Sequence, residues 1–249
     1  MRMFWRRVPL FVSILPGAIL LWGFREALRP ARGMPPAAAP AAAVETMRPG
    51  VFLLLGLGDS LTRGAGEGPG YAADVAEKLK KSHPGLRLEN LAVDGLETVG
   101  LKEVLAHPHA RALVSAAGAI LLSIGGNDLS HSVPRESLAA LPDEVLRSRE
   151  QMEKNLDEAL TTMRSLNASA PIVVLGLYNP FSSSSSGDLG SAVIADWNAA
   201  IEKIALRHRA ASVPIFDLFE RRPGRLSPDR FHPNRQGYEL IADRVMQAL

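Results

Sequence analysis

Residues 50–249 are predicted to form an α/β domain in which helices cover both faces of a doubly wound parallel sheet. Short apolar runs alternate along this part of the chain with longer segments whose apolar residues recur every three or four positions. Most of the runs have no polar face, which is typical of strands that are buried on both sides. With 249 residues, 47% of them hydrophobic, the chain is long enough for one such domain and an N-terminal extension.

Strands and helices are expected to alternate from residue 51 onward. The second of the five predicted strands alternates apolar and polar residues, and the others are nearly continuous apolar runs. The strands are expected at 51–57, 86–93, 118–125, 171–177 and 213–216. The helices are expected at 71–82, 98–106, 150–167 and 191–209, and Asn234 is placed to cap a last helix that runs to Leu249.

The N-terminal segments differ in composition from the domain. Residues 1–7 are basic, and residues 8–24 contain no charged side chain, a length at the short end for a membrane span and long for a signal-peptide core. Residues 25–49 are rich in alanine and proline, which is typical of a semi-rigid spacer. We therefore expect a basic N-terminus, a transmembrane anchor at 8–24, a linker at 25–49 and the folded domain at 50–249.

Cleavage as a signal peptide is the alternative to a retained anchor. The A-x-A sequences nearest the apolar segment fall within residues 35–44, farther from it than a cleavage site usually lies. A buried core helix is a third interpretation, but Pro9, Pro16 and Gly17 would interrupt that helix. Because a short basic N-terminus normally stays in the cytoplasm, the domain is expected outside it, anchored to the membrane, or secreted if the segment is cleaved.

The charge balance argues against a nucleic-acid partner. Residues 1–50 carry seven arginines and two glutamates, whereas the remaining residues carry 21 basic and 24 acidic side chains. The domain is therefore slightly acidic, and it has no basic stripe that would indicate nucleic-acid binding. The chain has no cysteine, which excludes disulfides, thiolate metal ligands, a cysteine nucleophile and a lipidated cysteine anchor.

Polar residues follow the predicted strands at the points where the apolar runs end. Because the carboxyl ends of parallel strands meet at one edge of a sheet, we expect these residues to lie close together. In chain order they are Gly58, Asp59 and Ser60; Asn90, Asp94 and Gly95; Gly125, Gly126, Asn127 and Asp128; Tyr178, Asn179 and Pro180; and Asp229 with His232.

This set of residues suits acyl transfer. A serine such as Ser60 is a weak nucleophile and needs an adjacent base, which His232 can supply, with Asp229 fixing the tautomer of the imidazole. The N–H groups of Ser60 and Gly95 and the amide of Asn127 are candidate oxyanion donors. Each residue also has a structural interpretation, as a helix cap, a turn residue or a surface pair. Their joint order, each after its own strand, favours catalysis.

Four sequence blocks resemble the signature blocks of the GDSL/SGNH hydrolases, over about residues 52–245. They are "GDSLT", the block around Gly95, "GGND" and D-x-x-H-P-N. The resemblance implies an esterase or lipase on a three-layer, flavodoxin-like sheet of five parallel strands in the order 2-1-3-4-5. It also implies that Ser60 is the nucleophile, that Asp229 and His232 complete the triad, and that Gly95 and Asn127 join the Ser60 N–H in the oxyanion hole.

Acidic residues beside these blocks are expected to have supporting roles. Asp59 is expected to hydrogen-bond its own loop and not to act as the triad acid, because adjacent side chains at a turn point apart. Asp128 is expected to support its loop in the same way. Asp94 would disfavour negative charge in the oxyanion hole unless its side chain points away from it.

The substrate is expected to be a small-molecule or lipid ester. The connections 129–149 and 179–190 are predicted to be long loops that shape the pocket, and Tyr178 and Phe181 are candidates to line it, or are core residues. The N-terminal anchor and "LYNPF" resemble the bacterial lipase/acylhydrolase branch of the family, which makes lysophospholipid esters plausible substrates. Acetylated cell-wall sugars are the alternative substrate class, and a tethered non-catalytic binding module is the alternative function.

No metal or cofactor is implied, and the remaining histidines are expected to be solvated or to cap helices. They are His83, His107, His109, His131 and His208.

Overall fold

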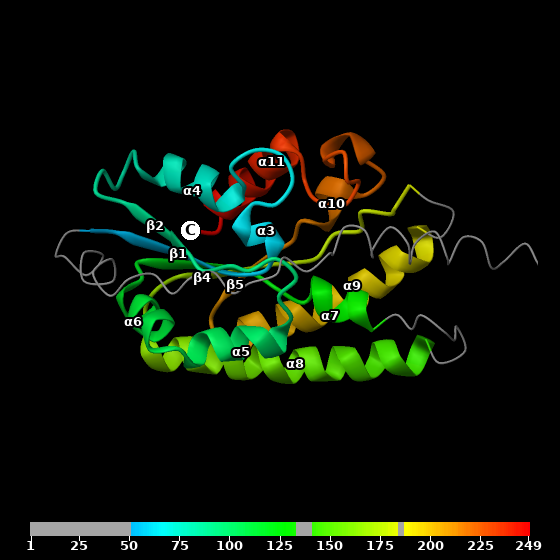
Figure 1. The fold of residues 1–249 in the computed structure, drawn as a ribbon, viewed down its shortest axis with the longest axis horizontal. Helices are drawn as coiled ribbons and strands as arrows, with labels where there is room; N and C mark the ends of the chain where they lie inside the picture. Colours follow the sequence, from blue (N-terminus) through cyan, green and yellow to red (C-terminus); the bar gives the residue numbers. More distant parts are fainter. Residues whose placement is uncertain (1–50, 133–140, 184–186) are drawn as a thin grey trace, which may run out of the picture.

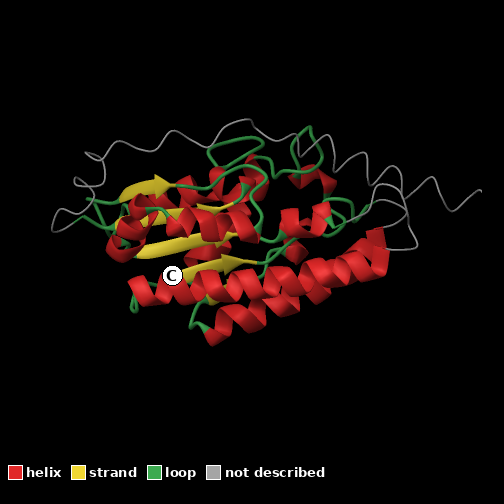
Figure 2. Ribbon diagram, turned by 60° about the horizontal axis from the view of Figure 1, so that its bottom comes forward, coloured by secondary structure: helices red, strands yellow, loops and turns green. Residues whose placement is uncertain are grey.

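The computed structural model describes residues 51–132, 141–183 and 187–249, and these form a sheet with helices on both faces (Figures 1 and 2). Its strands are β1 (Leu53–Gly58), β2 (Arg87–Asn90), β3 (Ala119–Ser123), β4 (Ile172–Leu175) and β5 (Ala211–Val213). The strand order is β2-β1-β3-β4-β5, and every neighbouring pair is parallel. The predicted α/β class and the five-stranded parallel sheet are confirmed.

Each face of the sheet has its own apolar core, because successive strand residues point to opposite sides. In β1, Leu53, Leu55 and Leu57 pack on one side, and Leu54 packs on the other. The first side is covered by α5 (Thr98–Ala106), α6 (Pro108–Ala116), α7 (Gly126–His131), α8 (Leu141–Leu166) and α9 (Gly187–Arg207). The second side is covered by α3 (Ser60–Arg63), α4 (Tyr71–Leu79), α10 (Phe216–Phe219) and α11 (Arg235–Met246), with a 3-10 turn, η2 (Pro223–Arg225), before α11.

The structure contains more helix than the sequence pattern predicts. Helices α6 and α7 are not predicted, although α6 begins with Pro108 after His107, whose side chain caps it. Helices α8 and α9 also begin earlier than predicted, at Leu141 and Gly187. The connections 129–149 and 179–190, predicted as loops, are therefore partly helical.

The last strand is shorter and lies earlier than predicted. We predict it at 213–216, but β5 is Ala211–Val213 and Phe216 begins the short helix α10. Pro214 explains the difference, because proline has no N–H with which to continue the ladder.

The predicted N-terminal segments at 1–7, 8–24 and 25–49 lie outside the described residues. Among the residues that are described, every helix is too short or too polar to cross a bilayer.

Candidate active site

Ser60 is the first residue of α3 and lies directly beyond the carboxyl end of β1. The turn before it depends on Gly58, which has a φ of 110° and where a Cβ atom would lie 1.9 Å from the carbonyl oxygen of Ser123. The Asp59 carboxylate accepts a hydrogen bond from the Leu61 N–H at 3.1 Å and caps α3. The tight turn places the Ser60 hydroxyl at the edge of the sheet where the strands end.

His232 reaches Ser60 from the loop that precedes α11. Its Nε2 lies 3.0 Å from the Ser60 Oγ, although the two residues are 172 positions apart in the chain. Ser227 holds this loop, because its N–H donates to the His232 carbonyl at 2.8 Å and its hydroxyl donates to the Pro233 carbonyl at 2.7 Å. These two hydrogen bonds from Ser227 hold the backbone that carries the imidazole in place.

Asp229 lies on the far side of the same imidazole. Its Oδ2 is 2.7 Å from His232 Nδ1, and its Oδ1 accepts the N–H groups of Phe231 and His232 at 2.9 and 3.0 Å. Burial works to raise the pKa of Asp229, but these hydrogen bonds outweigh it and hold the pKa below its ordinary value. A carboxylate can only accept, so Nδ1 carries the proton of the neutral ring and Nε2 is left to accept from the Ser60 hydroxyl.

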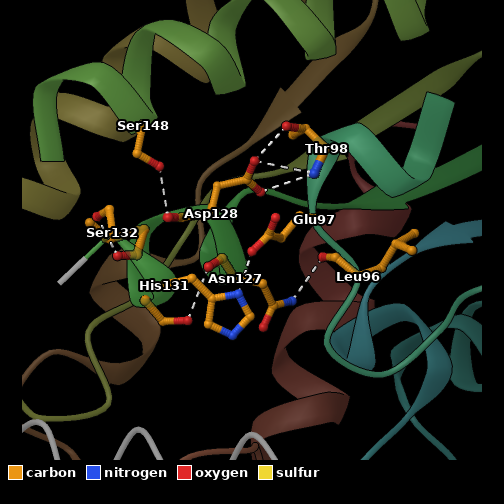
Figure 3. A network of polar contacts seen from close by, with 10 residues as sticks. Leu96, Glu97, Thr98, Asn127, Asp128, His131, Ser132 and Ser148 are labelled. Carbon is orange, nitrogen blue, oxygen red and sulfur yellow. Dashed lines mark hydrogen bonds and ion pairs between the residues drawn. The ribbon is translucent and has the colours of Figure 1, made fainter. Parts of the chain in front are cut away.

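Asn127 is attached to the loop that contains Gly95. Its Nδ2 donates to the Leu96 carbonyl at 2.9 Å, as Figure 3 shows. Asn127 is 4% exposed and also lines the pocket beside Ser60. The contact at Leu96 uses one N–H of the amide and leaves the second for another acceptor.

Asp128 ties the same two loops together at a second point. Its carboxylate accepts the Thr98 N–H at 3.0 Å and the Thr98 hydroxyl at 2.5 Å, at the N-terminus of α5 (Figure 3). Ser148 of α8 donates to the Asp128 carbonyl at 2.9 Å. Burial raises the pKa of Asp128, and the bonds from Thr98 partly offset that rise. The Asp128 side chain therefore links α7 to the N-terminus of α5 through hydrogen bonds.

Asp59 is buried beneath the Ser60 turn. In the part of the chain that the structure describes, no hydrogen bond joins Asp59 to His232. Burial raises the pKa of its carboxyl from 3.8 to about 7, against the opposing effect of hydrogen bonds from Ser123 and Leu61. The Ser123 hydroxyl donates to Asp59 Oδ1 at 2.5 Å.

A mainly apolar pocket opens beside Ser60, Asn127 and His232. Its apolar lining consists of Leu61, Ile124, Leu129, Leu177, Pro180 and Phe231, together with the ring of Tyr178. Within the part of the chain that the structure describes, the lining does not include Gly95 or Phe181. The ring centroid of Phe181 lies 6.3 Å from that of Phe231, which does line the pocket.

Phe231 lines the pocket, although the sequence pattern does not predict it as a site residue. Its ring meets the His232 imidazole edge to face, with centroids 5.0 Å apart. The Tyr178 hydroxyl donates to the Phe231 carbonyl at 2.5 Å, which joins the end of β4 to the histidine loop. The sequence feature that could have indicated Phe231 is an aromatic residue directly before the histidine.

Asp94, beside Gly95, and two of the remaining histidines have oppositely charged neighbours. Asp94 Oδ2 lies 3.5 Å from the Arg63 guanidinium, so its charge is partly neutralised. The exposed His131 pairs with Glu97 (Figure 3), and His208 Nε2 lies 2.7 Å from Asp157. No group of three or more potential metal ligands occurs in the described ranges.

Comparison with known proteins places this chain among ester-cleaving enzymes. A model of the family described as GDSL-like lipase/acylhydrolase matches residues 57–240. The uncharacterized protein YpmR of Bacillus subtilis (strain 168) is 33% identical over 208 residues, which cover 80% of this chain and 81% of YpmR. The range matched by the family model contains every candidate site residue from Asp59 to His232.

Two lipases are also similar to this chain. The spore germination lipase LipC of Bacillus licheniformis is 27% identical over 201 residues, which cover 77% of this chain and 93% of LipC. The crystal structure of the lipase Lip_vut3 from a goat rumen metagenome has a TM-score of 0.71 at 27% identity, and it covers 79% of this chain and 97% of that chain. The similarity therefore extends over most of the described domain.

Proposed function

Because the chain belongs to the GDSL-like lipase/acylhydrolase family and is a carboxylic ester hydrolase, we propose that Ser60 is its nucleophile. The observation that carries this proposal is the chain of contacts from Ser60 Oγ to His232 Nε2, at 3.0 Å, and from His232 Nδ1 to Asp229, at 2.7 Å. In this arrangement the histidine is the general base and the aspartate stabilises the imidazolium that forms.

The reaction has two balanced halves. Ser60 Oγ attacks the ester carbonyl carbon while its proton passes to His232 Nε2, and the carbonyl oxygen becomes an oxyanion. When the oxyanion collapses, the bond to the alcohol breaks and the alcohol takes the proton from Nε2. Water then attacks the acyl-enzyme with the same base, the acid is released and Ser60 regains its proton.

The oxyanion donors we propose are the N–H of Ser60, the second amide N–H of Asn127 and the N–H of Gly95. The position of Asn127 supports its role, because its amide is fixed by Leu96 while its side chain lines the pocket. The support for Gly95 is its place in the loop that Asn127 holds. Arg63, paired with Asp94, reduces the negative charge beside this loop.

The substrate we propose is a lipid-type ester with an apolar acyl group, such as a lysophospholipid. The apolar lining of the pocket, including Leu129, Leu177 and Phe231, supports this class. Tyr178 contributes its ring to the same wall. Phe181 is proposed to support the wall through its ring contact with Phe231.

The test is hydrolysis of p-nitrophenyl acetate, butyrate and longer esters by the purified full-length chain and by Ser60→Ala. We expect the substitution to lower kcat by about 10⁴-fold or more, because the oxyanion donors alone cannot replace the nucleophile. Ser115→Ala is a matched control, since the Ser115 hydroxyl is exposed on α6 and donates only locally, to Arg111. Equal rates from Ser60→Ala and the native chain would sink the proposal. A rate maximum at acetate, with release of acetate from acetylated cell-wall sugars, would favour the carbohydrate esterase alternative.

We also propose that residues 8–24 anchor the enzyme in the membrane, with residues 25–49 as a spacer and the domain outside the cytoplasm. The absence of charge in 8–24 supports the anchor, and the short basic N-terminus, which normally stays in the cytoplasm, supports the orientation. Cell fractionation with mass measurement of the mature protein tests it. A soluble product that lacks the first ~40 residues would refute retention of the anchor.

A further inference from the structure

We propose that Ser123, at the carboxyl end of β3, is a positioning residue that holds the Ser60 turn from both sides. The inference rests on the proposed role of Ser60 as the nucleophile. Ser123 is 3% exposed, and it belongs to the central strand that lies directly beside β1. Gly58 is its partner in the register of the two strands.

Ser123 contacts the residue before Ser60 and the residue two positions after it. Its carbonyl accepts the Asp59 N–H at 2.9 Å, and its hydroxyl donates to Asp59 Oδ1 at 2.5 Å. The same hydroxyl accepts the Thr62 N–H at 3.0 Å and lies 2.7 Å from the Thr62 hydroxyl. The backbone that carries Ser60 is therefore bonded to Ser123 on both sides of the nucleophile.

The donor and the acceptor of each hydroxyl hydrogen bond in this cluster can be assigned. Because the one proton of Ser123 goes to Asp59 Oδ1, the Thr62 hydroxyl must donate to Ser123. The Tyr71 hydroxyl, 2.7 Å from Thr62 Oγ1, must then donate to Thr62. All four side chains are buried, and Asp59 and Ser123 also line the pocket beside Ser60. Each of the three hydroxyl protons has a buried acceptor, and such hydrogen bonding makes a buried network rigid.

The rigidity of this cluster bears on catalysis through the Ser60 backbone. The Ser60 N–H is a proposed oxyanion donor, and the Ser60 Oγ must stay 3.0 Å from His232 Nε2. Without the Ser123 hydroxyl, the N–H and the hydroxyl of Thr62 lose their buried acceptor, and Asp59 Oδ1 loses one of its donors. The turn can then relax, and a displacement on the order of 1 Å at a nucleophile costs up to about 10²-fold in rate.

The test compares Ser123→Ala with Ser115→Ala in the full-length chain. We expect Ser123→Ala to lower kcat for p-nitrophenyl butyrate by about 10–10²-fold with KM changed less than about threefold. The rate at which diethyl p-nitrophenyl phosphate labels Ser60 should fall by the same factor. A merely structural role would lower the unfolding midpoint without changing the labelling rate of the folded fraction. Native kcat and a native labelling rate in Ser123→Ala would overturn the proposal.

A second pair of variants applies even if Ser123→Ala does not fold. Asp59→Asn retains an Oδ1 acceptor for Ser123 and Leu61, so it should keep kcat within about threefold of the native value, whereas Asp59→Ala should resemble Ser123→Ala. Full turnover in Asp59→Ala would also overturn the proposal. Failure of the proposed function looks different, because Ser60→Ala would then remain active.

Discussion

Replacing Asp59 by asparagine should make the fold less sensitive to pH. Burial raises the pKa of the Asp59 carboxyl from 3.8 to about 7, and nearby Asp128 adds to the rise, while the bonds from Ser123 and Leu61 oppose it. In the unfolded chain the carboxyl has its ordinary pKa. The folded protein therefore binds this proton more tightly than the unfolded chain does.

The sign and size of the effect follow from this difference. Below about pH 4 both states hold the proton, and the stabilisation is fully present. As the pH rises toward 7, the unfolded chain releases the proton first, so the free energy of unfolding falls, and the loss is complete above the folded pKa. A shift of about three pKa units, at about 1.4 kcal/mol each, corresponds to a loss of about 4 kcal/mol. The asparagine side chain of Asp59→Asn does not titrate, and its amide oxygen can still accept the bonds from Ser123 and Leu61.

The assay is denaturant unfolding of the native chain and Asp59→Asn, followed by circular dichroism between pH 4 and 8.5. Subtracting the two free energies of unfolding removes the contribution of every other titrating group. We expect the difference to change by about 4 kcal/mol in favour of the asparagine variant as the pH rises. A difference that is constant across this range would refute the reasoning, because it would mean that folding does not perturb the Asp59 carboxyl.

Two further substitutions test the site. Asn127→Ala should lower kcat for p-nitrophenyl butyrate by about 10²–10³-fold with little change in KM, and a near-native kcat would remove Asn127 from the oxyanion hole. Gly66→Ala should destabilise the fold by about 1–3 kcal/mol and lower kcat, because Gly66 has a φ of 104° and a Cβ there would lie 2.6 Å from the Pro233 carbonyl oxygen and 2.9 Å from His232 Cβ. Gly224→Ala is the matched control for denaturant unfolding and turnover, since a Cβ at Gly224 meets no atom within 4 Å. Equal stability and turnover in the two glycine variants would contradict the close packing at Gly66.

The sheet could be predicted because its apolar runs have few alternatives. The strands β1, β3 and β4 are buried on both faces, so each of them is visible in the sequence as a continuous apolar run. The helices were harder to predict, because α9 begins within a serine- and glycine-rich segment whose local preference is for a loop. Tertiary packing against the sheet outweighs that preference.

The sequence predicts those candidate site residues whose side-chain type indicates their chemistry. It does not predict contacts that depend on how the backbone runs through the fold. Ser60, Asp229 and His232 follow their strands in the expected order, and the structure brings their side chains into hydrogen-bond distance. Ser123 was hidden inside an apolar run, and its importance appears only when β3 lies beside β1. The position of the Gly95 N–H depends on the course of its loop, which residue types do not specify.

The separation of 172 residues between Ser60 and His232 has a consequence for the time at which the enzyme becomes active. At synthesis rates of about 5–20 residues per second, the histidine follows the serine from the ribosome by roughly 9–34 s. Helix α11, which packs against α4, follows the histidine loop in the chain. With Ser60 and His232 in their proposed roles, the nascent chain therefore carries an unactivated serine until the histidine has been made, and its ability to cleave esters should arise only after α11 docks.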